Sequence, residues 1–272
     1  MKVAVLGTGS RGNATLVEAG GTRLLVDVGF SAREIERRLD TLGVAPESLD
    51  GIVVSHDHSD HTRGLSFARR YDLDVHLTEG TWRAARRHLR GSERVRPYRS
   101  GVPFEIGRIR IEPFATIHDA ADPVGLALVD LDTGLRVGIA TDLGRPTAQI
   151  RHALSGSNFL VLEANHDEAM LHAGPYPWSV KSRIASSHGH LSNHAAARFA
   201  CELLHDDLAG ILLAHLSVEC NDPQLALRVV GSALTKAGYD GLLEVAVQDE
   251  PSTLFDLVDL KARRAPAQYS LF

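Results

Sequence analysis

Short apolar runs bounded by turn residues recur along the whole chain. Runs of about four to eight apolar and β-branched residues between glycine, asparagine or aspartate are typical of β-strands. The predicted strands cover residues 2–6, 14–18, 23–28, 51–54, 74–78, 102–106, 109–113, 125–131, 135–141, 159–163, 210–214 and 242–247. The turn Asp132-Thr133-Gly134 joins two of these runs into a predicted hairpin.

Helical segments lie between the strands. Ser31 and Glu34 form a capping box at the start of a helix predicted to end near residue 42. Further helices are predicted at residues 60–70, 79–90, 146–154, 192–205 and 223–237. No linker rich in proline, serine or glycine divides the chain, and the sequence contains no repeat. We therefore expect one α/β domain over residues 1–272, built on mixed sheets.

The composition is that of an ordinary globular protein. Of the 272 residues, 44% are hydrophobic and 23% are charged, and the formal net charge is −5. This charge excludes a uniformly basic coat for nucleic acid but allows a local basic face. The two cysteines, Cys201 and Cys220, form no Cys-x-x-Cys motif, which favours a reducing intracellular setting over secretion.

The chain has no apolar run suited to targeting or to a membrane. Residues 1–7 are too short an apolar segment for a signal peptide. No run approaches the roughly 20 apolar residues of a membrane span. We expect a cytoplasmic protein that does not contact membranes.

A local basic stretch stands out at residues 81–100. Seven arginines occur there against one acid, Glu93. The arginines are Arg83, Arg86, Arg87, Arg90, Arg94, Arg96 and Arg99. Two interpretations stay open: a patch that contacts a phosphate backbone, or a solvated arginine-rich helix.

The segment Gly7-Thr8-Gly9-Ser10-Arg11-Gly12 matches the Gly-x-Gly-x-x-Gly pattern of dinucleotide sites. That pattern has its meaning only where a helix follows. Here residues 14–18 read as a strand that ends in a Gly20-Gly21 turn, so we reject a dinucleotide site. A glycine loop folded over the edge of an active site remains possible.

The strongest chemical signal is the sequence His56-Asp57-His58-Ser59-Asp60-His61, which follows a predicted strand. Imidazole and carboxylate groups are the usual ligands of zinc and of harder divalent ions. These side chains cannot all converge on one ion. Two neighbouring ions are therefore expected, one near His56 and His58 and the other near Asp60 and His61.

Three later residues supply further candidate ligands. His118, Asp142 and His215 each lie at the end of a predicted strand. A sheet holds such side chains rigidly, which is how a protein fixes metal geometry.

The order of these residues resembles the metallo-β-lactamase-fold hydrolases over essentially the whole chain. The resemblance implies a four-layer αβ/βα sandwich with two metals at one edge between the sheets. It implies one metal on His56, His58 and His118, a second on Asp60, His61 and His215, and Asp142 bridging them. Asp27 would orient a histidine ligand from behind. The metals would be zinc or manganese, with iron as a further option.

A second segment narrows the resemblance toward nucleases. An aspartate at position 142 disfavours the β-lactamases themselves. Gly189-His190-Leu191-Ser192-Asn193 resembles the Gly-His-x-Ser loop of nucleases with this fold. Together with the glycine loop, residues 163–167 and residues 181–184, it looks most like the bacterial YycJ (WalJ) group. That group implies a 5′-to-3′ exonuclease acting on DNA, with single-stranded DNA favoured and RNA possible.

The implied mechanism uses two metals to deprotonate a shared water, whose hydroxide attacks the phosphodiester. His190 would hold the scissile phosphate or protonate the leaving oxygen. We therefore place His190, Asp60 and Asp27 in the catalytic set. The predicted substrate-binding residues are His190, Ser192, Asn193, Lys181 and Arg183.

Three other functions compete with this one. A small-molecule hydrolase of the same fold, either a cyclic phosphodiesterase or a glyoxalase II-type thioesterase, is the principal alternative. A non-catalytic member of the fold is disfavoured because all seven ligand positions are filled. Flavodiiron redox chemistry is disfavoured because the flavin domain is absent. Exo- against endonuclease action and oligomeric state stay open.

Overall fold

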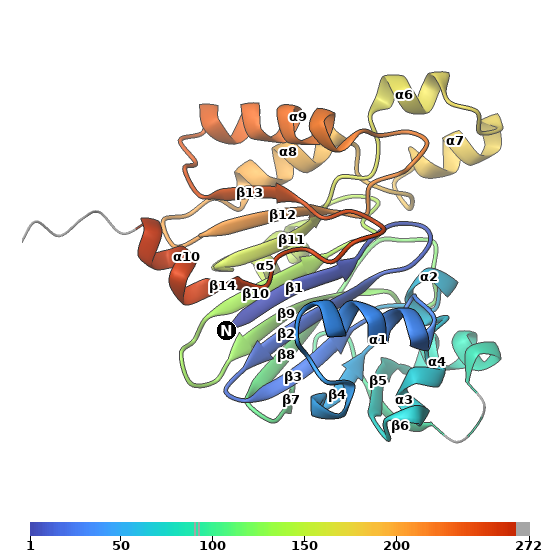
Figure 1. Ribbon diagram of the computed structural model, residues 1–272. Coiled ribbons are helices and arrows are strands. Elements are labelled where there is room, and N and C mark those ends of the chain that lie inside the picture. The colour runs from blue at the N-terminus through green and yellow to red at the C-terminus, as the bar shows by residue number, and fades with distance from the viewer. Residues whose placement is uncertain (90, 92, 265–272) are drawn as a thin grey trace, which may run out of the picture.

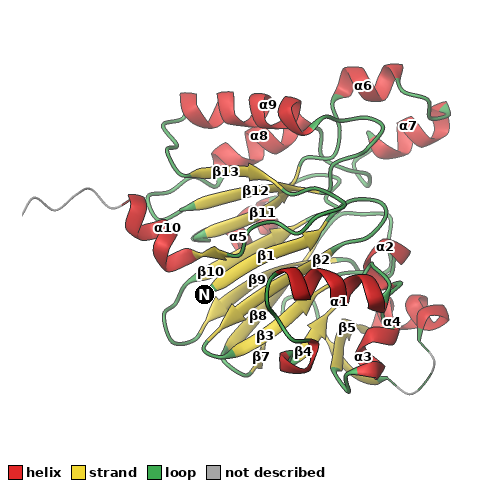
Figure 2. Ribbon diagram, viewed as in Figure 1, coloured by secondary structure: helices red, strands yellow, loops and turns green. Residues whose placement is uncertain are grey.

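Two seven-stranded β-sheets lie face to face in the middle of the molecule, with helices on both outer faces (Figure 1). The structure is a computed structural model that describes residues 1–89, 91 and 93–264. The first sheet has the order β14-β1-β2-β3-β4-β5-β6, and the second has the order β13-β12-β11-β10-β9-β8-β7. Figure 2 shows the strands as the two inner layers. The four-layer sandwich expected from the sequence is confirmed.

The strands of the first sheet are β1 (Lys2–Gly7), β2 (Ala14–Ala19), β3 (Thr22–Val26), β4 (Gly51–Val53), β5 (Asp74–Thr78), β6 (Arg94–Tyr98) and β14 (Phe255–Asp256). Those of the second are β7 (Phe104–Ile106), β8 (Ile109–Ala115), β9 (Val124–Asp130), β10 (Arg136–Ala140), β11 (Phe159–Glu163), β12 (Gly210–Ala214) and β13 (Leu242–Val245). In each sheet, an antiparallel series gives way to a parallel one, at β3 in the first and at β10 in the second.

Each outer face carries its own helices. The first sheet is accompanied by α1 (Ala32–Thr41), α2 (Ser59–Thr62), α3 (Ser66–Arg70) and α4 (Glu79–Ala84), with short 3₁₀ turns at η1 (Pro46–Ser48) and η2 (Ala85–His88). The second is accompanied by α5 (Ala148–Leu154), α6 (Glu168–Ala173), α7 (Trp178–Ile184), α8 (Asn193–Glu202) and α9 (Pro223–Lys236), and α10 (Leu257–Arg264) follows β14.

The core explains why many strands read as unbroken apolar runs. In β12, Leu212 and Ala214 pack between the two sheets, whereas Ile211 and Leu213 pack under α8 and α9. Both faces of this strand are therefore covered, and alternation of polar and apolar residues is lost. The same arrangement brings the carboxyl ends of β3, β4, β10, β11 and β12 to one edge, where the polar residues follow.

The prediction of one continuous helix at residues 60–70 is wrong, because this segment forms two short helices, α2 and α3. Gly64 lies between them, and its N–H donates to the carbonyl of Val28 at 2.7 Å. A methyl group at this position would overlap the carbonyl oxygen of Phe30 and lie 2.6 Å from that of Val28. Only glycine therefore allows the backbone between α2 and α3 to pack this closely against the segment that follows β3.

The arginine-rich stretch is also not one helix. It forms α4, the 3₁₀ turn η2 and the edge strand β6, while Arg90 lies outside the described residues. Arg94 forms ion pairs with Asp72 at 2.9 Å and Asp74 at 2.7 Å, and Arg96 pairs with Asp74 at 2.9 Å. These ion pairs neutralise part of the positive charge of the stretch. Both acids lie outside it, earlier in the sequence.

No helix in the described part of the chain combines the length and the apolar character needed to cross a bilayer.

We predict that Gly64→Ala lowers the free energy of unfolding by about 1–3 kcal/mol, because the added methyl overpacks the contact between α2 and β3. Urea denaturation followed by circular dichroism measures this change. Gly231→Ala is the matched control, since Gly231 lies inside α9 and its added methyl would meet only the flexible end of Leu243, at 3.3 Å. This control is expected to be neutral or slightly stabilising. Equal stability of both variants would contradict the account of Gly64.

Candidate metal centre

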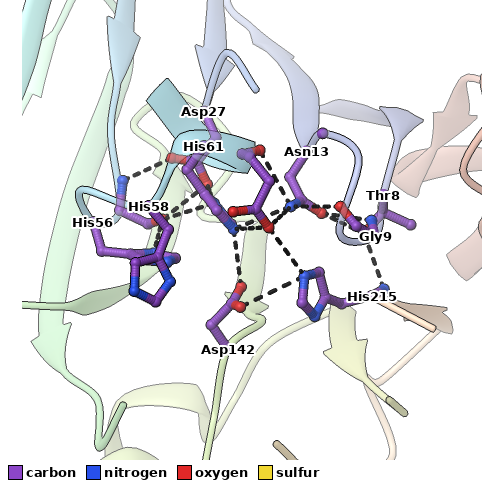
Figure 3. Close-up of polar contacts among 12 residues, drawn as sticks. Thr8, Gly9, Asn13, Asp27, His56, His58, His61, Asp142 and His215 are labelled. Carbon is purple, nitrogen blue, oxygen red and sulfur yellow. Dashed lines mark hydrogen bonds and ion pairs between the residues drawn. The ribbon is translucent and has the colours of Figure 1, made fainter. Parts of the chain in front are cut away.

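The polar residues at the shared edge of the sheets directly follow strand ends. Asp27 follows β3, Asp142 follows β10 after one residue, and His215 follows β12. All three have left-handed backbones, with φ of 63°, 54° and 56°. This conformation costs free energy in residues other than glycine, and such strain is concentrated at functional sites. It turns each side chain away from its strand and toward a common centre (Figure 3).

The histidines and aspartates predicted as metal ligands come together at this centre. Their ligand atoms form overlapping groups whose members lie within 4.8 Å of one another. These groups are His56, His58 and His118; Asp60, His61 and His215; His56, His61 and Asp142; and Asp142, Glu163, His190 and His215. Asp142 therefore lies between the two sets of three, as the bridging position requires.

Several atoms at the centre are buried without a hydrogen bond. Nε2 of His56, Oδ2 of Asp142 and Nε2 of His215 have no hydrogen-bond partner among the described residues. Unsatisfied buried polar atoms are rare because they cost free energy. All three belong to imidazole or carboxylate groups, the types that bind divalent metals, so the cluster fits a dinuclear divalent metal site.

The protonation of the histidines depends on their neighbours. Burial and the nearby His61 hold the pKa of His56 well below its usual value, and burial likewise lowers the pKa of His118. Both rings are therefore neutral and have a lone pair to offer. Burial opposes charge on His215 too, but Asp142, Asp60 and Glu163 outweigh it and raise the pKa of His215 to about 10. Carboxylates likewise raise the pKa of His61 despite its burial.

Asp27, at the end of β3, holds Ser55 and His61 in place through hydrogen bonds. Its Oδ1 accepts the backbone N–H of Ser55 at 2.8 Å, and its Oδ2 accepts from the hydroxyl of Ser55 at 2.9 Å. The same Oδ2 lies 2.8 Å from Nδ1 of His61. This contact places the proton of neutral His61 on Nδ1 and leaves Nε2 facing Asp142, 3.1 Å away. The contact predicted from the sequence between Asp27 and a histidine is present.

Glu163 has the corresponding place in the second sheet and was not among the residues predicted for the site. It ends β11, is completely buried, and its Oε1 lies 2.8 Å from Nδ1 of His190 and 3.0 Å from Nδ1 of His215. Its Oε2 accepts the backbone N–H groups of Leu143 and Leu191. Burial disfavours the charged form, yet His190 and His215 lower the pKa of Glu163 to about 2. The sequence feature that could have identified Glu163 is its position as an acid at the end of an otherwise apolar strand.

His190 lies beside the centre and not within either set of three. Its ring centroid is 5.1 Å from that of His118 and 5.2 Å from that of His215. Burial lowers the pKa of His190, but the Glu163 carboxylate outweighs it and raises the pKa above the usual value. A protonated ring at this place can hold a phosphate oxygen or release a proton.

The glycine loop supports the centre from the other side. Asn13 accepts at Oδ1 from the hydroxyl of Thr8 at 2.9 Å and from the N–H of Gly9 at 2.8 Å. The Thr8 hydroxyl also accepts the backbone N–H of His215 at 2.9 Å, and Nδ2 of Asn13 lies 3.0 Å from Nε2 of His61 (Figure 3). Because β2 follows this loop in place of a helix, the rejection of a dinucleotide site is consistent with the structure.

The four remaining residues predicted to bind substrate differ in their surroundings. Ser192 caps α8, and its hydroxyl donates to Glu168 at 2.5 Å. Asn193 is completely buried and pairs with Asn221 through two hydrogen bonds of 2.8 and 2.9 Å. Both side chains are thus engaged within the protein, and their contact with substrate stays a prediction.

Lys181 and Arg183, by contrast, lie on α7 at the surface. Lys181 donates to the carbonyl of His172 at 2.7 Å, and Arg183 lies 3.5 Å from Asp119. The carbonyl of Asp119 is 3.2 Å from Nε2 of His58. Arg183 therefore borders the centre directly.

Two mixed sheets that present histidines and aspartates at one shared edge define a metallo-β-lactamase-fold protein. A family model described as a beta-lactamase superfamily domain matches residues 22–211. The chain belongs to this superfamily, as the resemblance in its motifs indicated.

Individual relatives match over most of the chain. It is 36% identical over 240 residues to the exodeoxyribonuclease YycJ of Bacillus anthracis, covering 87% of this chain and 90% of that protein. It is 32% identical over 265 residues to the exodeoxyribonuclease WalJ of Streptococcus pneumoniae, covering 95% and 98%. The crystal structure of the metallo-beta-lactamase fold protein YhfI from Bacillus subtilis aligns with a TM-score of 0.69 at 20% identity, covering 92% and 98%.

We predict that Glu163→Gln lowers the pKa of His190, because the carboxylate that holds the ring in its charged form is lost while burial remains. Nuclear magnetic resonance titration of the histidine ring protons in metal-depleted protein measures the shift. Glu168→Gln is the control, since the Glu168 carboxylate bonds to Ser192. An unchanged pKa in Glu163→Gln, or an equal fall in both variants, would contradict the assignment.

Proposed function

We propose that this protein is a dinuclear metal-dependent nuclease, acting on DNA as a 5′-to-3′ exonuclease. The observation that carries the proposal is the similarity to two proteins named exodeoxyribonucleases, which extends over 87% and 95% of the chain. It is supported by a centre at which the side chains suited to metal binding converge. Single-stranded DNA is the favoured substrate.

In this proposal, His56, His58 and His118 would hold one divalent ion, and Asp60, His61 and His215 would hold the other. Asp142 would contribute to both sites, and the metal would be zinc or manganese. Two such ions would lower the pKa of a water and offset the negative charge of a phosphodiester. Asp27 and Glu163 keep the protons of neutral His61 and His215 on Nδ1, so that Nε2 of each ring carries the lone pair that a metal would use.

His190 is the proposed general acid. Its ring is 18% exposed, so substrate can reach it, and its Nδ1 is fixed by Glu163. The remaining nitrogen, Nε2, is the atom that would give a proton to the oxygen leaving the phosphorus. Burial lowers the pKa of His190, but the Glu163 carboxylate outweighs it and favours the protonated ring that a general acid needs.

Surface cations complete the proposed substrate path. Arg183 borders the centre through its ion pair with Asp119. Lys181 lies two residues earlier on the same helix, α7. Because these side chains would meet phosphates, binding of DNA should weaken steeply with added salt. The arginines of β6 are a less favourable surface because Asp72 and Asp74 neutralise part of their charge.

Substrate profiling tests the function as a whole. The metal-loaded protein is incubated with 5′-labelled and 3′-labelled single-stranded DNA and RNA, with a cyclic phosphodiester and with a glutathione thioester. We expect cleavage of DNA with products released from the 5′ end. Rapid thioester hydrolysis without any cleavage of nucleic acid would refute the nuclease and favour the small-molecule hydrolase.

We predict that the protein binds two divalent ions per chain and that Asp142→Ala reduces this number. Loss of the shared carboxylate should lower cleavage of single-stranded DNA by about 100-fold or more, since metal stabilisation of a transition state amounts to several kcal/mol. Elemental analysis of the purified variant measures the metal. Asp132→Ala, in a surface hairpin where Asp132 pairs with Arg108, is the control and should match the wild type. An Asp142→Ala protein with two ions and full activity would remove Asp142 from the centre.

We predict that His190→Gln slows DNA cleavage by about 10²–10⁴-fold, the usual range for loss of a general acid. Hydrolysis of bis(4-nitrophenyl) phosphate should fall far less, because nitrophenolate leaves without needing a proton. Rates on both substrates across pH distinguish this role from a structural one. Equal losses on the two substrates would show that His190 does not act on the leaving group.

A further inference from the structure

A pocket lies next to the centre, between α6 and α7. It has a volume of about 400 Å³ and is lined by His166, Glu168, His172, Trp178 and Lys181, among others. Figure 1 shows α6 and α7 as a projection that stands apart from the remaining helices on the second sheet. Neither helix was predicted from the sequence, and of the residues that line the pocket the proposed function uses only Lys181. Its volume is in the range of pockets that bind small organic groups.

One wall of the pocket is the indole of Trp178. With 73% of its surface exposed, it is the most exposed large apolar side chain in the described part of the chain. A tryptophan this exposed gains little from burial in the fold, yet it lines a concave space. Nucleic-acid proteins use such rings as stacking surfaces for unpaired bases.

His166 supplies an unsatisfied polar atom in the same pocket. It is 97% buried, with 3% of its surface exposed, and its Nδ1 has no hydrogen-bond partner among the described residues. The residue is fixed by its backbone, since its carbonyl accepts from the N–H of Asn193 at 2.8 Å. Nδ1 can donate or accept according to the tautomer, so it would gain a partner if the edge of a heteroaromatic ring reached it.

The charges of the pocket suit a nucleotide. Lys181 carries a positive charge at its rim and can meet a phosphate, whereas the Glu168 carboxylate is already engaged by the hydroxyl of Ser192. An aromatic face, one free polar atom and one cation together match a base with its neighbouring phosphate. A purely apolar ligand would leave His166 unsatisfied and would have no use for Lys181.

The pocket is also joined to the centre by short connections. Ser192 bonds to Glu168 of the pocket and follows His190 by two residues. Arg183, on the same helix as Trp178 and Lys181, reaches Asp119 beside His58. From Trp178 to Arg183 the helix rises by only about 8 Å, a distance comparable with one or two nucleotides of a strand.

We propose that this pocket binds an unpaired base of the substrate strand, stacked on Trp178, next to the phosphodiester that is cut. The inference rests on the proposed nuclease function and specifies its substrate. A base held in a duplex is already stacked and paired, so it cannot enter the pocket. The pocket would therefore select single-stranded ends.

The test compares a single-stranded oligonucleotide with the same strand made abasic at one position at a time near the cut end. For the metal-loaded wild type, removal of the bound base should lower kcat/KM by about tenfold or more. In Trp178→Ala this preference for the intact strand should disappear, and Trp178→Phe should restore most of it. Val258→Ala, an exposed apolar residue on α10, is the control and should retain the wild-type preference.

Binding provides a readout that does not depend on cleavage. Fluorescence anisotropy of labelled single-stranded DNA with metal-depleted protein should give a Kd about tenfold weaker for Trp178→Ala than for Val258→Ala. A wild type that cleaves DNA but ignores the abasic position, or a Trp178→Ala protein with the wild-type preference, would overturn the base pocket alone. A wild type that neither binds nor cleaves nucleic acid would overturn the nuclease function and this inference together.

Discussion

The centre depends on two buried carboxylates, one from each sheet, that contact the Nδ1 atoms of its histidines. Asp27 contacts His61, and Glu163 contacts both His190 and His215. Each also accepts backbone N–H groups, which ties the loops after the strands to the sheets. A buried charge is tolerated only when it is paired and hydrogen-bonded, and both acids meet this condition. Without them, the imidazoles would lose both their orientation and their tautomer.

The same edge also stores backbone strain. Asp27, Asp142 and His215 adopt left-handed conformations, each immediately or almost immediately beyond a buried strand. The surrounding sheets are apolar on both faces and closely packed, so they can hold these conformations against the cost. The glycine loop contributes from outside, where Thr8 and Asn13 link His215 to His61. Rigid strands, strained ends and a supporting loop together fix the positions of the ligand atoms.

The sequence predicts the parts of this structure that local pattern controls. Apolar runs located most strands, and ligand-type residues at their ends identified the centre, because strand ends meet at one edge of a sheet. Glu163 escaped notice because its role arises from residues 27 and 52 positions further along the chain. The break at Gly64 depends on a carbonyl of Phe30, and the arginines of β6 are neutralised by Asp72 and Asp74. In each case the deciding partner is distant in sequence or outside the motif.

Sharing of one carboxylate oxygen by two rings has a thermodynamic consequence. Oε1 of Glu163 meets both His190 and His215, so any cation bound through His215 competes with the proton on His190 for the same negative charge. Binding equilibria coupled in this way are reciprocal: occupancy of one site changes the affinity of the other by an equal factor. A metal bound through His215 would therefore lower the pKa of His190, and a proton on His190 would in turn weaken the binding of the ion. In the proposed enzyme, the two events form a linked pair of binding equilibria, in which His190 would become a stronger acid when the ion is in place.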